Sequence, residues 1–293
     1  MKGRDTILSI RDLEVTFKVR DRQLKAIRRI SFDLYRGETL AIVGESGSGK
    51  SVLMKSLTGM LESNGTVSGG SIRFFGEELA QKKKPREWES IRGAKIATVF
   101  QDPMTFLNPV LRIETQLIEP ILNHHPDMDK KEAIAKAIEL MRKVGIPSPE
   151  NRIRQYPFQF SGGMRQRIII AIALACDPKV IIADEPTTAL DVTIQAQVLE
   201  LINNLKDEID SSIIMITHDL GVVASICDRI AIMYGGKIVE TGTTDEIFYE
   251  PKHPYTKGLL SCISNPEETE RKELHPIPGS PPDLLNIAEG CPF

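Results

Sequence analysis

The first third of the chain alternates apolar and polar residues, as β-strands that cover a core on one face do. Ile30, Phe32 and Leu34 alternate with polar neighbours and predict a half-buried strand. The apolar run Thr39–Val43 predicts a second strand, a glycine-rich loop follows it, and residues 51–60 have a helical pattern. This order of strand, glycine-rich loop and helix predicts a βα unit.

The middle of the chain has helical periodicity from about residue 109 to residue 146. Asp129 is a suitable N-cap for a helix in this region, and Gly145 is a suitable stop. The apolar positions that repeat at helical spacing are Ile134, Ile138 and Met141.

The βα pattern returns after residue 160. Helices are predicted over 161–176 and 198–209, and buried strands over 179–183, 212–217 and 230–233. We therefore predict an α/β fold in which a helical segment is inserted into the core.

The expected insertion lies between about residues 105 and 170. Beyond about Tyr249 prolines accumulate, which predicts an extended or irregular tail and not a second βα domain.

Length and composition are those of a globular protein. A chain of 293 residues suffices for one large domain or two ordinary ones. Its 37 Lys and Arg residues against 40 Asp and Glu residues give a net charge of −3, which argues against a protein that coats nucleic acid. The longest apolar run, Ile168–Cys176, is about half the ~20 residues of a membrane-spanning helix. No apolar signal-peptide core follows Met1, so secretion is not expected.

Residues 44–51 fit the P-loop pattern in the required strand–loop–helix context. Backbone N–H groups of such a loop surround phosphates, which needs glycines where a Cβ would clash or where φ is positive. The positive end of the following helix points at the same anion. Lys50 is predicted to reach the β- and γ-phosphates, and Ser51 to offer its hydroxyl to Mg²⁺. The predicted nucleotide-binding residues of the loop are Gly44, Glu45, Ser46, Gly47, Ser48, Gly49, Lys50 and Ser51.

A second signal is the apolar strand 179–183, which is followed by Asp184 and Glu185. In P-loop enzymes an aspartate after such a strand holds Mg²⁺. Glu185 lies just beyond it, where a carboxylate can orient a water molecule and accept its proton. A solvated loop charge is the alternative for Glu185.

A third signal is Ser161-Gly162-Gly163, in which Ser161 is expected to cap a helix whose first turn contains the two glycines. Each glycine weakens a helix by about 1 kcal/mol relative to alanine. A helix end whose backbone must approach a phosphate accounts for the two glycines, but the chain has no second P-loop to supply that phosphate.

These motifs together resemble the nucleotide-binding subunits of ABC transporters. The resemblance covers about residues 5–250 and implies a P-loop NTPase with a RecA-like core, an N-terminal antiparallel β part, the helical insertion and a C-terminal extension. The implied domains are an ATPase domain over 1–250 and the extension over 251–293. The motifs lie in the family's order: 44–51, Gln101, 161–165, Asp184-Glu185, Ala189-Leu190-Asp191 and His218.

One departure from the family pattern lies in the third motif. The family commonly has Leu-Ser-Gly-Gly-Gln, whereas this chain has Phe160 and Met164 at the two ends. The central Ser-Gly-Gly is intact, so we expect function to be kept.

The resemblance also implies roles for single residues. Gln101 would join Mg²⁺ to the attacking water, Asp184 would help hold Mg²⁺, and His218 would contact the γ-phosphate. Phe17 matches the aromatic residue that stacks on adenine, with a place in the core as the alternative. Two such domains face head to tail, so that one domain closes on the ATP of the other through Ser161, Gly162, Gly163 and Asp191.

The tail resembles the C-terminal extension of oligopeptide and dipeptide permease ATPases through His253-Pro254-Tyr255-Thr256 and Ile277-Pro278-Gly279. In several relatives a Gly-Cys-Pro opening leads into a cysteine cluster, in some cases with a [4Fe–4S] centre. Cys291 is therefore a candidate iron–sulfur ligand, and the chain is expected to be shortened at this point. A plain thiol is the alternative, because one thiolate cannot hold a cluster that needs about four.

The resemblance predicts an ATP-hydrolysing subunit of a dipeptide or oligopeptide importer at the cytoplasmic face of the cell membrane. The implied partners are a second, non-identical ATPase subunit, two membrane-spanning permeases and an extracytoplasmic peptide-binding protein, without nucleic acid. The alternatives are nickel or another small solute as cargo, a soluble ABC ATPase acting on DNA or in translation, and a P-loop kinase or GTPase. The short insertion, the single ATPase half and the missing guanine motif count against the last two.

Overall fold

The computed structural model describes residues 5–82, 84–100, 103–188, 190–262, 282–286 and 290–293, and the chain divides into two units. Unit 1 combines Met1–Lys82 with Met215–Phe293, and unit 2 is Lys83–Ile214. The point of division lies within strand β8, Ser212–Thr217. The domain boundaries expected from the sequence stay predictions.

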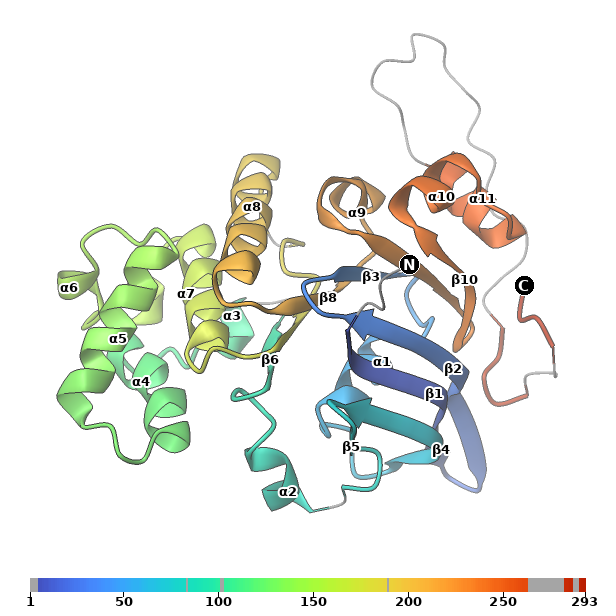
Figure 1. Cartoon of the computed structure of the whole chain (residues 1–293), viewed down its shortest axis with the longest axis horizontal. Helices are drawn as coiled ribbons and strands as arrows, with labels where there is room; N and C mark the ends of the chain where they lie inside the picture. The colour runs from blue at the N-terminus through green and yellow to red at the C-terminus, as the bar shows by residue number, and fades with distance from the viewer. Residues whose placement is uncertain (1–4, 83, 101–102, 189, 263–281, 287–289) are drawn as a thin grey trace, which may run out of the picture. The chain divides into compact units, whose positions relative to one another are not determined.

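Unit 1 begins with an antiparallel sheet whose strands lie in the order β2-β1-β4-β5 (Figure 1). Leu13 and Val15 of β1 are fully buried while Glu14 between them is partly exposed, which is the pattern of a sheet with one covered face. The expected N-terminal antiparallel part is therefore confirmed. The bounds are Thr6–Val19 for β1, Arg22–Tyr35 for β2, Gly65–Phe74 for β4 and Glu77–Glu78 for β5.

A second set of strands in unit 1 supports the glycine-rich loop. Strand β3, Thr39–Val43, runs parallel to β9, Arg229–Tyr234, and β10, Lys237–Thr243, pairs with β9 in the antiparallel sense. Every residue of β3 is buried, as in a parallel strand covered on both faces. Helix α1, Lys50–Leu57, follows the loop, so the predicted βα unit is confirmed.

The tail of unit 1 contains helices as well as irregular chain. Helix α11, Pro254–Ser261, begins with a proline, whose fixed φ and missing N–H suit the first helical position. The ring Nδ1 of His253 accepts a hydrogen bond from the backbone N–H of Tyr255, 3.2 Å away, and caps this helix. The prediction of a wholly extended or irregular tail was therefore wrong here. The other helices of this part of unit 1 are α9, Leu220–Ile226, and α10, Thr244–Tyr249.

Unit 2 is largely helical beside two parallel strands, β6, Ile96–Val99, and β7, Val180–Asp184. The predicted helical run over 109–146 forms two helices, α4 and α5. Asp129 is the N-cap of α5, and its carboxylate accepts a hydrogen bond from the N–H of Glu132, 2.8 Å away. The helices are α2 Pro85–Glu89, α3 Pro103–Phe106, α4 Ile113–His124, α5 Lys130–Lys143, α6 Pro149–Arg152, α7 Gly162–Leu174 and α8 Val192–Glu208, with a 3₁₀ turn at Pro157–Gln159.

Helix α7 has a deeply buried centre, in which Ile168, Ile169 and Ile170 are at most 2% exposed. Within the described ranges of the chain, no helix is both long enough and apolar enough to cross a bilayer.

Candidate functional site

The loop between β3 and α1 has the backbone that its glycines require. Gly47 has φ of +80° and Gly49 has φ of +107°, both in the region that favours glycine. A Cβ on Gly44 would lie 2.2 Å from the backbone oxygen of Met233 in β9, so no side chain fits there. The sequence-based reasons for these glycines, positive φ and close approach, are therefore both confirmed.

Lys50 folds back over the loop that precedes it. Its Nζ donates hydrogen bonds to the backbone oxygens of Gly44, at 2.6 Å, and Glu45, at 2.9 Å. The side chain is nearly buried, and a buried ammonium group needs partners such as these carbonyls. This arrangement places the positive charge of Lys50 beside the backbone of Gly44 and Glu45.

Several polar groups of the loop suit an anionic ligand. Gly49 is the N-cap of α1 and cannot cap it with a side chain, and the first turn of α1 has no acidic residue. The helix therefore presents a positive N-terminus to the loop. The Oγ of Ser48 is buried without a hydrogen-bond partner among the described residues, and Ser51 is an exposed residue. These groups fit phosphates with a bound Mg²⁺.

Replacing Gly44 with alanine is expected to lower the free energy of unfolding by about 3 kcal/mol, the upper end of the usual cost of overpacking, because the new Cβ displaces the Met233 carbonyl. Gly47→Ala is the matched control, because a Cβ on Gly47 would meet no other atom of the described residues within 4 Å. Its only expected cost is that of an alanine in a left-handed backbone conformation, about 1–2 kcal/mol. Urea denaturation of the two variants measures the difference. Equal losses for both would contradict the role given to close packing at Gly44.

Unit 1 also holds two other residues predicted from the sequence. His218 directly follows β8 and is exposed. The ring of Phe17 is half-buried and lies against Gly65 of the neighbouring strand β4, where a Cβ would be 2.6 Å from Phe17 Cε1. This contact gives Phe17 a packing role on the sheet, and the stacking role stays a prediction.

In unit 2, Asp184 ends β7 and Glu185 follows it with φ of +45°, which is uncommon for a residue other than glycine. The Oε2 of Glu185 accepts a hydrogen bond from the hydroxyl of Thr188, 3.0 Å away. Residues in sparsely populated backbone conformations are found mainly at functional sites. The turn therefore fixes the direction of the Glu185 carboxylate.

The start of α7 also lies in unit 2. The Oγ of Ser161 accepts a hydrogen bond from the N–H of Met164, 3.4 Å away, which confirms Ser161 as the N-cap. The two glycines that follow differ. A Cβ on Gly163 would lie 2.7 Å from Ile194 of α8, so packing is a sufficient reason for this glycine, whereas the space around Gly162 is open.

Two further predicted residues complete the set. Asp191 is the N-cap of α8, and its Oδ1 accepts a hydrogen bond from the N–H of Ile194, 3.0 Å away. The motif Ala189-Leu190-Asp191 alone did not indicate that Asp191 caps a helix. Gln101 and Ala189 lie outside the described residues.

Sequence reasoning missed Tyr255 as a neighbour of the loop. The backbone N–H of Glu45 donates a hydrogen bond to the Tyr255 hydroxyl in α11, 3.1 Å away. The two residues are far apart in the sequence, so no local pattern could have revealed the pair. The only available signal was the tail motif His253-Pro254-Tyr255-Thr256 itself.

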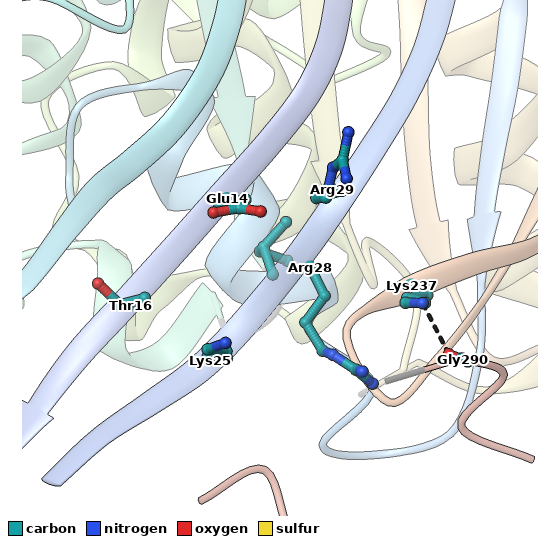
Figure 2. Close-up of a pocket in the computed structure, with 8 residues that line it drawn as sticks. Glu14, Thr16, Lys25, Arg28, Arg29, Lys237 and Gly290 are labelled. Carbon is teal, nitrogen blue, oxygen red and sulfur yellow. Dashed lines mark hydrogen bonds between the residues drawn. The ribbon is translucent and has the colours of Figure 1, made fainter. Parts of the chain in front are cut away.

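A pocket of about 330 Å³ lies where the β1–β2 hairpin meets the tail (Figure 2). The Nζ of Lys237 donates a hydrogen bond to the backbone oxygen of Gly290, 2.7 Å away. Burial of Arg28, another lining residue, lowers the pKa of its guanidinium group. The described lining residues are Glu14, Thr16, Lys25, Ile27, Arg28, Arg29, Lys237 and Gly290, which include no residue of the P-loop. The tail therefore lines this pocket through Gly290.

The Cys291 thiol lies beside the ring of His253. Its Sγ is 3.5 Å from His253 Nε2. Across the ranges that the structure describes, no three His, Cys, Asp or Glu side chains gather as metal ligands. These residues do not fit an iron–sulfur cluster, which needs about four ligands.

Comparison with known proteins shows the family of the chain. The ABC transporter family matches residues 27–188, and the oligopeptide/dipeptide transporter C-terminal region matches residues 239–293. The chain is 55% identical to the oligopeptide transport ATP-binding protein AmiE of Streptococcus pneumoniae, over 100% of this chain and 82% of AmiE. It is 52% identical to the dipeptide transport ATP-binding protein DppD of Lactococcus lactis, over 99% of this chain and 82% of that protein.

Solved structures agree as well. The ATP-binding cassette MJ0796, a dimer bound to ADP and Pi in a post-hydrolysis state, has a TM-score of 0.71 and 26% identity, over 81% of this chain and 98% of that one. The cbiO1 subunit of the cbiONQ transporter of Clostridium perfringens has a TM-score of 0.72 and 28% identity, over 84% of this chain and 92% of that one.

The fold and the glycine-rich loop define a P-loop ATPase. The chain belongs to the ABC transporter family and is an ABC-type ATPase. Its C-terminal part is of the oligopeptide/dipeptide transporter type.

Proposed function

We propose that this ATPase powers the import of dipeptides or oligopeptides across the cytoplasmic membrane. The observation that carries the proposal is the match of residues 239–293 to the C-terminal region of oligopeptide/dipeptide transporters. Similarity to peptide transport ATP-binding proteins along nearly the whole chain supports it.

The P-loop is proposed to hold the phosphates of ATP. Lys50 would leave the carbonyls of Gly44 and Glu45 and bond the β- and γ-phosphates, a favourable exchange because a phosphate carries a full charge. Ser51 and Asp184 would hold Mg²⁺, which neutralises charge on the phosphates when bound. Phe17 would stack on the adenine.

Hydrolysis is proposed to use Glu185 as the general base. Its carboxylate would accept a proton from a water molecule while the oxygen of that water bonds to the γ-phosphorus and the bond to ADP breaks. Gln101 and His218 would orient the water and the γ-phosphate. The fixed turn at Glu185 and its bond to Thr188 support a directed carboxylate.

A head-to-tail pair of ATPase domains is proposed to form the complete site. The Ser161-Gly162-Gly163 backbone of one domain would approach the phosphates bound by the other, and Asp191 would lie near the same nucleotide. The open space at Gly162 supports this, because nothing in the described chain requires a glycine there. The dimeric state of the solved cassette also supports it.

Gly162→Ala is expected to raise the stability of the chain and to weaken its ATP-dependent pairing. Alanine is a better helix former, so the free energy of unfolding is expected to rise by up to about 1 kcal/mol. ATP-dependent pairing is expected to weaken by about tenfold or more, because the new methyl group occupies the path of the phosphate. Urea denaturation and light scattering with MgATP measure the two effects. Unchanged pairing would remove Gly162 from the interface.

The proposed partners are a second, non-identical ATPase subunit, two permeases and an extracytoplasmic peptide-binding protein, which would place the chain at the cytoplasmic face of the membrane. Capture of the full chain from detergent-solubilised membranes tests this proposal. Recovery with two hydrophobic permease subunits and another ABC ATPase is expected. Recovery of the chain alone, without a permease, would count against transport.

A further inference from the structure

The tail of the chain contacts the P-loop at one peptide. The backbone N–H of Glu45, the second residue of the loop, donates a hydrogen bond to the hydroxyl of Tyr255, 3.1 Å away. Tyr255 is fully buried at the start of α11, at 0% exposure. A residue of the tail thus meets the loop that precedes the proposed phosphate site.

The next peptide unit of the loop, whose carbonyl belongs to Glu45, is held within the loop itself. The backbone oxygen of Glu45 accepts hydrogen bonds from Lys50 Nζ, at 2.9 Å, and from the N–H of Ser48, at 3.2 Å. The bond from Lys50 breaks when Lys50 turns to the phosphates of ATP. The bond to Tyr255 involves neither Lys50 nor the helix N-terminus, so it can persist when nucleotide binds.

The position of Tyr255 is fixed from several directions. Its ring centroid lies 4.5 Å from that of Tyr234 in β9 and 5.6 Å from that of Phe293. The backbone N–H of His253, the cap of α11, donates to the carboxylate of Glu240 in β10, 3.0 Å away. Burial raises the pKa of Tyr255 to about 12, so the hydroxyl keeps its proton at neutral pH. A side chain packed in this way presents its oxygen at a constant place.

We propose that Tyr255 is a positioning residue, which holds the Glu45 peptide and thereby fixes the P-loop in the shape that binds nucleotide phosphates. The proposal rests on the phosphate-binding role proposed for the loop. It gives the tail a part in ATP binding that is separate from any contact with permeases.

The test is Tyr255→Phe, which removes the hydroxyl and keeps the ring packing. We expect the Kd of the full chain for MgATP to rise about 5- to 30-fold, because without this bond the free loop leaves the binding shape by about 1–2 kcal/mol and the nucleotide must restore it. Calorimetric titration should still find the same number of sites per chain. Tyr234→Phe, in the same ring cluster, is the matched control and should change the Kd less than twofold.

Two results would overturn the proposal. One is an unchanged Kd in Tyr255→Phe. The other is a reduced number of sites with an unchanged Kd, because loss of folded protein alone gives that pattern. Failure of the underlying phosphate-binding role would look different, since MgATP binding would then be insensitive to Lys50→Met.

A measurement on the unmodified chain covers the case in which Tyr255→Phe does not fold. Hydrogen exchange of the Glu45 amide should be slowed by its bond to Tyr255, both without nucleotide and with MgATP. In a folded Tyr255→Phe variant the same amide should exchange about tenfold faster. Free exchange of this amide in the unmodified chain would contradict the proposal.

Discussion

Glu185→Gln is expected to bind MgATP with nearly unchanged affinity and to hydrolyse it at least ~10²-fold more slowly, which is the typical effect of a lost general base. Glutamine has nearly the shape of glutamate, and its side-chain oxygen can still accept the hydrogen bond from Thr188. The turn with its positive φ at residue 185 is therefore preserved. What is lost is the group that accepts a proton from water.

The experiment compares ATP turnover and ATP binding in the full chain, and in the assembled complex once the second ATPase subunit is supplied. Glu200→Gln, an exposed change of the same chemistry on α8, is the control and should leave turnover within twofold. Because ATP is held but not cleaved, the Glu185→Gln protein should also accumulate in the ATP-bound pair. Near-normal turnover in Glu185→Gln would remove this residue from the role of base.

Lys50→Met is expected to weaken MgATP binding by about 10²-fold or more, a loss of about 3 kcal/mol, because charge-assisted hydrogen bonds to phosphate are among the strong ones. Methionine has a similar length and no charge. The loop also loses the bonds that Lys50 donates to the carbonyls of Gly44 and Glu45, so its shape without nucleotide is less fixed.

The control for Lys50→Met is Lys55→Met, five residues along the same helix. Lys55 lies in the last turn of α1, at the end away from the loop, and forms an ion pair with Glu62. Replacing Lys55 with methionine therefore changes the net charge by the same amount as Lys50→Met without removing a contact of the loop. We expect a change in the Kd for MgATP of less than twofold. Similar losses in the two variants would mean that net charge, and not contact with the phosphates, governs binding.

The sequence allowed the P-loop and its βα unit to be predicted in detail, because both depend on local rules. Gly47 and Gly49 have positive φ, and Gly44 lies against Met233 without room for a Cβ. Asp129 and Ser161 are helix N-caps as predicted, since capping needs only a polar side chain within reach of the next turn. Motif order could then identify the family, which the comparisons confirm.

Contacts between distant segments could not be predicted in the same way. The pairing of Glu45 with Tyr255 depends on how the tail packs against unit 1, and a proline-rich composition suggested only irregular chain. The helix there forms because proline occupies its first position and His253 caps it. Likewise, the different reasons for Gly162 and Gly163 depend on the packing of α7 against Ile194.

ATP-driven peptide uptake tests the central claim most directly. The complex captured through this chain would be placed in liposomes with its peptide-binding protein, with MgATP on the side of the ATPase and labelled dipeptides and oligopeptides on the other. We predict that peptide accumulates only with MgATP, and that accumulation is abolished in the Glu185→Gln complex. ATP hydrolysis by the complete complex without movement of peptide, or with movement of nickel in its place, would contradict the account.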